Sequence, residues 1–291
     1  MDSNDPASAL VALLDLEPLD RDLFRGARDP LASGRVFGGQ VVAQALVAAS
    51  RTVPAERQAH SLHAFFVRPG DDALPIIYHV ERDRDGGSFS NRRVVARQNG
   101  EAILNMIASF HIDEPGLRHQ DPMPEVPPPE ELKSDQQLAR ELPGLPEHLR
   151  AFVSRSRGVE MRRTSLGSLT GEPGAPSQSI WMRLTRDAPD DPTFRRAILA
   201  YVSDFGLLGT AMIPHGVGWA TKGLRSASID HAVWFHDDPD VGAWHLYTME
   251  SSWAGGARAF NTGRMFSRDG RLIASTAQEG LMRVPLEKKE T

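Results

Sequence analysis

The chain of 291 residues contains no cysteine. This absence excludes disulfides, thiolate metal sites and a cysteine nucleophile, and it fits a reducing compartment. Basic and acidic residues are nearly balanced: the chain has 33 Lys and Arg and 38 Asp and Glu, for a formal net charge of −5. A dedicated nucleic-acid-binding protein usually carries a strongly basic surface. We therefore expect no nucleic-acid partner.

The sequence also lacks long apolar runs and targeting signals. No uninterrupted apolar run approaches the roughly 20 residues that a membrane span needs. Residues 1–6 are acidic and polar, without the basic region of a secretory signal, and the C-terminal tripeptide is not a peroxisomal signal. We expect a cytoplasmic protein without a membrane span.

Several common catalytic motifs are missing. The string nearest to a Gly-x-Ser-x-Gly nucleophile elbow, at residues 86–90, lacks the second glycine. The chain has no P-loop and no His-Glu-x-x-His zinc motif. We therefore expect neither a resident metal nor a cofactor.

Two hairpin signals stand at matching places in the two halves of the chain. Asn99-Gly100 and Asp269-Gly270 lie about 170 residues apart, and each is flanked by strand-like runs. Such dipeptides supply the positive φ angles of a two-residue type I′ turn. The string that begins at His63 also resembles the string that begins at His231. These landmarks indicate an internal repeat.

Each half begins with one helix. Gly38-Gly39 leads into a helix over residues 40–49, and Asp191 caps a second helix whose apolar stripe extends from residue 194 to residue 212. Small residues on both helices would allow a sheet to wrap closely around them. The pattern predicts an α+β fold that uses one helix and several antiparallel strands twice.

A proline-rich segment at residues 121–130 separates the copies, because proline lacks the N–H donor that helices and sheets need. We expect a first unit over residues 8–115 and a second over residues 177–286. Residues 116–176 form the linker and an irregular segment.

Three polar residues lie where the pattern favours apolar ones. Asp204 lies near the edge of the second helix's stripe, Ser228 opens the strand 228–235, and Gln278 aligns with Ala108 of the first copy. A solvated carboxylate and a hydroxyl satisfied at a strand edge are the simpler interpretations of the first two. If helix and sheet pack together, the three could hold a water, with Asp204 as general base and Ser228 and Gln278 as orienting groups.

The chain resembles the acyl-CoA thioesterase II family over most of its length. In the first half the resemblance lies in LFRG (23–26), RVFGGQVVAQAL (35–46), HSLHAFFVRPGD (60–71) and GSFSNRRV (87–94). In the second half it lies in YVSD (201–204), SIDHAVWFH (228–236) and AQEG (277–280).

The resemblance implies a double hotdog fold, in which two helix-plus-sheet units of one chain join their sheets. It implies hydrolysis of fatty acyl-CoA to free fatty acid and CoA by direct attack of water, and a homodimer or homotetramer. The family's Asp, Thr or Ser, and Gln fall on Asp204, Ser228 and Gln278. Many members have Thr at the second position, and Ser228 keeps the hydroxyl while losing a methyl group.

The sequence indicates the residues that would contact the substrate less clearly. Four aromatic residues could line the acyl tunnel or belong to the core: Phe65, Phe66, Trp234 and Phe235. Three arginines could meet the CoA phosphates or be ordinary surface residues: Arg68, Arg92 and Arg93.

Two alternatives remain from the sequence. A hotdog hydratase or dehydratase would need an Asn-Pro-x-His string or its equivalent, which is missing. A non-catalytic acyl-CoA-binding or regulatory protein would have no use for a carboxylate that activates water.

Overall fold

The computed structural model describes residues 5–29, 34–155, 157–187 and 189–284. The expected end of the second unit, at residue 286, lies outside these ranges. The first half contains α1 (Pro6–Leu14), β1 (Glu17–Asp20), β2 (Leu23–Gly26), α2 (Gly38–Ser50), β3 (Arg57–Phe66), β4 (Ile76–Asp85), β5 (Phe89–Gln98) and β6 (Glu101–Ile112). The second half contains β8 (Ser177–Leu184), α6 (Pro192–Ser203), α7 (Leu207–Thr210), η2 (Ile213–His215), β9 (Arg225–Ser228), β10 (Asp230–Phe235), β11 (His245–Gly255), β12 (Arg258–Ser267) and β13 (Leu272–Arg283).

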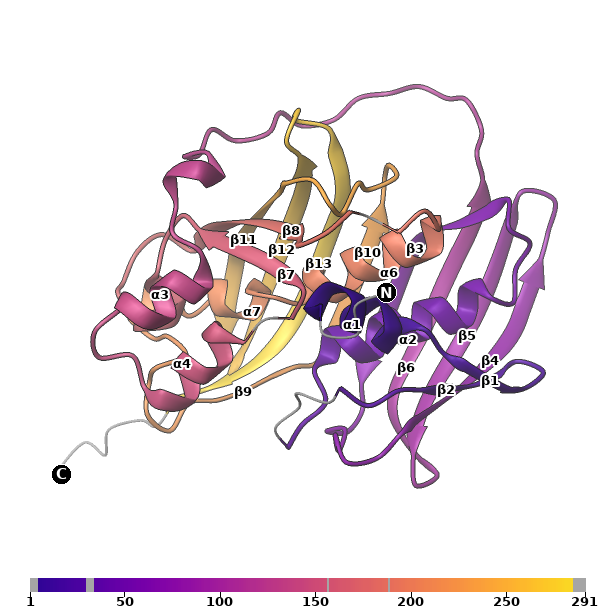
Figure 1. Ribbon diagram of the computed structural model, residues 1–291, viewed down its shortest axis with the longest axis horizontal. Helices are drawn as coiled ribbons and strands as arrows, with labels where there is room; N and C mark the ends of the chain where they lie inside the picture. Colours follow the sequence, from indigo (N-terminus) through magenta and orange to yellow (C-terminus); the bar gives the residue numbers. More distant parts are fainter. Residues whose placement is uncertain (1–4, 30–33, 156, 188, 285–291) are drawn as a thin grey trace.

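Within the described ranges the strands form one curved sheet of 13 strands (Figure 1). Its order is β1-β2-β4-β5-β6-β3-β10-β13-β12-β11-β8-β7, and β9 pairs with β13. The halves repeat each other, because β4-β5-β6-β3 on one side corresponds to β11-β12-β13-β10 on the other. They join where β3 pairs with β10 in antiparallel register, with Leu62 opposite Val233. This is the expected double hotdog arrangement, and the fold class is confirmed.

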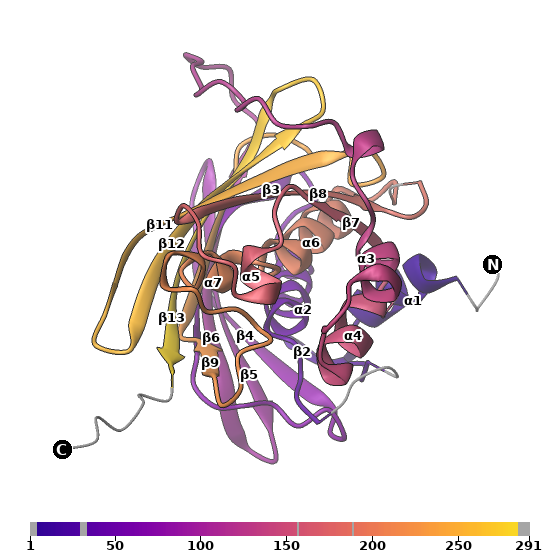
Figure 2. The same cartoon turned by 90° about the vertical axis from the view of Figure 1, so that its left-hand side faces the viewer.

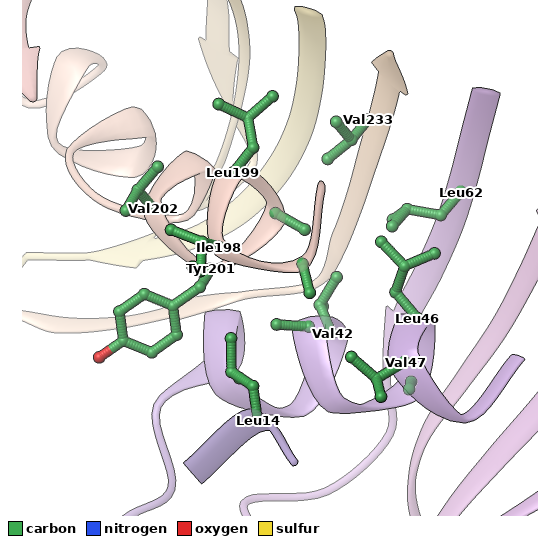
Figure 3. Packing of buried hydrophobic residues seen from close by; sticks show 14 of the residues in the cluster. Leu14, Val42, Leu46, Val47, Leu62, Ile198, Leu199, Tyr201, Val202 and Val233 are labelled. Carbon is green, nitrogen blue, oxygen red and sulfur yellow. The ribbon is translucent and has the colours of Figure 1, made fainter. Parts of the chain in front are cut away.

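Helices α2 and α6 pack against each other on the concave face of the sheet (Figure 2). Residues 39–49 of α2 are all buried, as an enclosed helix of small and β-branched residues should be. Val42 of α2 and Ile198 of α6 lie between the two helices, Leu46 of α2 points towards Leu62 of the sheet, and Val233 lies in the same cluster (Figure 3). The two repeats therefore share one hydrophobic core.

The two predicted hairpin turns have different backbone conformations in the structure. Asn99 and Gly100 have φ of 48° and 81°, so this hairpin has the predicted type I′ turn. In the second hairpin Gly270 has a positive φ, at 88°, whereas Asp269 does not. The N–H of Gly270 donates to the carbonyl of Ser267, which gives a three-residue loop with a bulge. The type I′ prediction was wrong there because the loop is one residue longer.

The segment expected to be linker and irregular carries ordered elements: η1 (Pro129–Glu131), α3 (Asp135–Glu141), α4 (Glu147–Ser154), β7 (Val159–Arg163) and α5 (Gly167–Thr170). After β6 the chain crosses the top of the sheet before it reaches α3 (Figure 1). β7 pairs with β8 and extends the edge of the sheet. A buried ion pair at 3.0 Å between Arg163 and Asp135 ties β7 to α3.

The second helix ends earlier than its apolar stripe predicts. α6 stops at Ser203, Asp204 is its C-terminal cap, and Gly206 with a φ of 84° turns the chain into α7. Asp204 therefore lies at the end of the helix, not within it. Among the described residues, one helical stretch, Pro192–His215, is long and apolar enough to cross a membrane, although the sequence predicts no membrane span. Its most apolar window is 83% buried inside the protein, as in a core helix.

The close approach of α2 and α6 depends on Gly39. A Cβ atom at this position would lie 2.4 Å from the backbone oxygen of Tyr201. We predict that Gly39→Ala lowers the free energy of unfolding by about 1 to 3 kcal/mol, the usual cost of overpacking. Urea denaturation would measure it. Gly87→Ala is the matched control, because a Cβ atom there meets nothing within 4 Å. Equal effects of the two substitutions would contradict this account of the helix contact.

Candidate active site

The structure brings Asp204, Ser228 and Gln278 together. The amide nitrogen Nε2 of Gln278 donates to Oδ1 of Asp204 at 2.8 Å. The Ser228 hydroxyl and the backbone N–H of Gly39 also donate to the Asp204 carboxylate. The three residues come from the end of α6, the end of β9 and the middle of β13.

The electrostatics of Asp204 reflect two opposing effects. Burial raises the pKa of Asp204 from 3.8 to about 6, while the hydrogen bonds from Gln278, Gly39 and Ser228 hold it below what burial alone would give. Gly39 lies in the first turn of α2, where the helix dipole favours a negative charge. The carboxylate can therefore be ionised near neutral pH and still accept a proton readily.

Glycines allow the N-terminus of α2 to reach this carboxylate. A Cβ atom on Gly38 would lie 2.8 Å from Oδ2 of Asp204, closer than a carbon atom can approach. The Gly38-Gly39 pair of the sequence thus lets backbone N–H groups approach the acid.

Ser228 is held by strand pairing. It is the last residue of β9 and lies opposite Gly280 of β13, two positions beyond Gln278, so Ser228 and Gln278 face the same side of the sheet. β9 and β10 are separated at Ile229, and the neighbouring Asp230 accepts the N–H of Glu279 at 2.6 Å. These contacts fix the break in the strand that positions the hydroxyl.

A cavity of about 1090 Å³ opens beside these residues. Asp204 and Ser228 line it, whereas Gln278 does not and is fully buried. Its walls come from the start of α2, the end of β3, α4 and the loop before β9. Six of its lining residues are cations: Arg35, Arg68, Arg155, Arg157, Arg163 and Lys222.

Only some of the residues that the sequence suggested for substrate contact line the cavity. Phe66 and Arg68 line the cavity. Phe65 points to solvent with 59% of its surface exposed, while Trp234 and Phe235 do not line the cavity.

The other two arginines have structural partners. Arg92 is buried and donates to Thr52 and Asp85, and Arg93 pairs with Glu81 on the surface. Neither lines the cavity.

The hydrogen-bond network includes His231, which the sequence pattern had not indicated as a site residue. His231 is fully buried, and its Nδ1 lies 3.1 Å from Nε2 of Gln278. The signal was present in the sequence, because His231 shares the inward face of its strand with Val233 and Phe235. A histidine on an apolar strand face needs a hydrogen-bond partner.

No group of three or more metal-ligating side chains occurs in the part of the chain that the structure describes. The site is instead a carboxylate, a hydroxyl and an amide at the wall of a large cavity. Such groups can activate a water molecule and bring it to a bound electrophile.

Two family models match the chain. The model of acyl-CoA thioesterase matches residues 151–281, and that of the acyl-CoA thioesterase N-terminal domain matches residues 27–111. The N-terminal-domain model lies within the first repeat, and the other model covers the last part of the connecting segment and the second repeat.

Full-length relatives agree with the family models. The chain is 41% identical to acyl-CoA thioesterase 2 of Haemophilus influenzae, over 96% of this chain and 99% of that protein. It is also 41% identical to human acyl-coenzyme A thioesterase 8, over 99% and 93% of the two chains. The crystal structure of acyl-CoA thioesterase II TesB2 from Mycobacterium marinum matches with a TM-score of 0.78 at 40% identity, covering 97% of this chain and 99% of that one. The chain therefore belongs to the acyl-CoA thioesterase family and is a thioester hydrolase.

Proposed function

We propose that the protein hydrolyses fatty acyl-CoA to free fatty acid and CoA by direct attack of water, without a covalent acyl-enzyme. The observation that carries this proposal is the carboxylate of Asp204, which is half-buried at the cavity wall and held by three hydrogen-bond donors. A cavity of about 1090 Å³ is slightly larger than the usual range for ligand sites, which suits a long substrate.

In this mechanism the water oxygen bonds to the thioester carbonyl carbon while Asp204 takes the water proton. The tetrahedral intermediate then collapses, the carbon–sulfur bond breaks, and the CoA thiolate leaves. The thiolate takes up the proton that Asp204 received. Ser228 orients the water directly from the cavity wall, and Gln278 does so through the carboxylate that it holds. A base whose pKa lies near the working pH is well suited to this task.

The charges of the cavity suit an anionic substrate. Arg35, Arg68 and Lys222 lie at exposed positions of the lining, where they can attract the phosphates of CoA. Phe66 and Leu149 offer apolar surface to the acyl chain.

The remaining expectations enter the proposal on the same resemblance. We propose a homodimer or homotetramer, a cytoplasmic location, and units over residues 8–115 and 177–286. The segment 116–176 connects these units and supplies α4 to the cavity.

The first test is release of CoA from saturated acyl-CoAs of increasing chain length. A thiol reagent reports only free CoA, because the protein has no cysteine. Wild type should release thiol, and Asp204→Asn should lose at least about 100-fold in kcat, since general-base catalysis contributes about 10²- to 10⁴-fold. Its affinity for a non-hydrolysable thioether analogue should stay within about threefold.

The control for this test is Asp22→Asn, a carboxylate paired with Arg82 and remote from the cavity lining, which should keep wild-type activity. Hydrolysis by Asp204→Asn at the wild-type rate would show that Asp204 is not the base. No release by wild type from any substrate would favour the non-catalytic binding protein.

A second prediction concerns pH. Because the base must be ionised, kcat/KM should fall about tenfold per pH unit below a midpoint near pH 6, where Asp204 titrates, and should be level above it. The profile should be measured with an S-acyl-pantetheine, which lacks the CoA phosphate that titrates in the same range. A midpoint near pH 4 would indicate a carboxylate that is not buried during the reaction.

A further inference from the structure

Gln278 cannot reach the cavity in this structure. Its side chain is fully buried, and it is not among the residues that line the cavity. Its Nε2 has two protons, and two acceptors lie within hydrogen-bond distance of it: Oδ1 of Asp204 at 2.8 Å and Nδ1 of His231 at 3.1 Å. The amide oxygen Oε1 is sealed from solvent and has no partner among the described residues. Gln278 therefore acts on Asp204 and not directly on a bound water.

The neighbours of His231 determine which of its nitrogens carries the proton. The Ser203 hydroxyl donates to the carbonyl of Ala200 at 2.8 Å. Its oxygen is then free to accept, and it lies 2.8 Å from Nε2 of His231. The proton therefore belongs on Nε2, and Nδ1 is left as an acceptor for Gln278. Burial lowers the pKa of His231 to about 4, so the ring is neutral when Asp204 works.

This bare Nδ1 selects the orientation of the Gln278 amide. A flipped amide would place Oε1 against both the Asp204 carboxylate and the lone pair of Nδ1, two repulsive contacts in a buried site. Without His231, a flipped Gln278 amide would make one repulsive contact instead of two. The amide nitrogen that donates to Asp204 would then be less firmly fixed in its place.

The first repeat provides an internal comparison. Leu62 pairs with Ala108, the counterpart of Gln278. In the second repeat Ala232 pairs with Ala277, so the preceding residue, His231, lies beside Gln278. The apolar pair Leu62 and Ala108 thus corresponds to the polar pair His231 and Gln278. The sequence alignment of His63 with His231 was wrong by one residue, because His63 is exposed whereas Leu62 and His231 lie on the buried face. The same framework packs without the polar pair, which indicates that the pair serves the site that only the second repeat carries.

We propose that His231 is a positioning residue that, through its unprotonated Nδ1, orients the Gln278 amide so that Gln278 holds the carboxylate of Asp204. This inference rests on the proposed function, because it assigns a purpose to residues around the proposed base.

The test compares His231→Leu with His231→Asn. Leucine has the apolar character of Leu62 but removes the acceptor, whereas the asparagine Oδ1 stands close to where Nδ1 was. His231→Leu should lower kcat about tenfold or more, with KM within about threefold of wild type. It should also move the acid limb of kcat/KM to higher pH by at least about half a unit, because Asp204 keeps its burial but loses a firmly held donor. His231→Asn should stay within about threefold of wild type in kcat and leave the limb in place.

The acid limb reports on Asp204 itself. No charged side chain contributes to the shifted pKa of Asp204 or of His231. The titratable groups that sense Asp204 are Tyr201 of α6 and Tyr247 of β11, and burial raises the pKa of both. Asp230 and Glu279 flank His231 and Gln278 in sequence, but they alternate to the opposite face of their strands.

Two further variants separate positioning from general support of the fold. His245→Leu removes another buried histidine whose pKa burial lowers and whose Nδ1 contacts the carbonyl of Ala243, outside this network, and it should leave the acid limb unchanged. In a Gln278→Leu background, His231→Leu should cause no further loss of kcat, since it acts only through Gln278.

If a variant does not fold, ¹⁵N NMR of histidine-labelled wild-type protein shows which nitrogen of His231 carries the proton. The signals of His231, assigned by their loss in the asparagine variant or by their coupling to neighbouring β10 residues, should show an unprotonated Nδ1. An Nδ1-protonated ring would overturn the inference. An unchanged acid limb in His231→Leu, or additive losses in the double variant, would overturn it as well. Full activity of Asp204→Asn would instead show that the proposed function has failed.

Discussion

A buried carboxylate must keep its hydrogen bonds, and this requirement organises the site around Asp204. The donors come from three directions: the N-terminus of α2 through Gly39, β9 through Ser228 and β13 through Gln278. The end of α6 is itself braced by the Tyr247 hydroxyl, which donates to the carbonyl of Ser203 at 2.9 Å. The long curved sheet and the paired helices thus serve to hold one acid in place at a cavity wall.

The duplication supplies the framework, and a few polar residues in one copy supply the chemistry. Arg92 pairs with Ala108 in the first repeat, as Asn261 pairs with Gln278 in the second. In the first copy the buried Arg92 guanidinium is held by Thr52 and Asp85, so that region is a closed structural contact. One chain therefore carries one constellation of this kind among its described residues.

Much of the fold and of the candidate site could be predicted from the sequence. The repeat, the helix after Gly38-Gly39 and the first hairpin turn follow from local patterns, and the trio of candidate residues followed from polar side chains at apolar positions together with a family resemblance. The break of the second helix after Ser203 could not be predicted, because an apolar stripe continues through it and only Gly206 marks the turn. The protonation of His231 depends on the Ser203 hydroxyl, a contact between α6 and β10 that spacing does not reveal. The cavity walls join residues from both repeats and the connecting segment, which no local pattern brings together.

The central claim is that water attacks the thioester while Asp204 only takes its proton. A single turnover of excess enzyme with an acyl-CoA in H₂¹⁸O, followed by mass spectrometry of the fatty acid and of the peptide that contains Asp204, tests it most directly. The account predicts one ¹⁸O atom in the fatty acid from the first turnover and none in the peptide. A first-turnover fatty acid that contains only ¹⁶O, with ¹⁸O in Asp204, would show that the carboxylate attacks the substrate, and it would contradict the account.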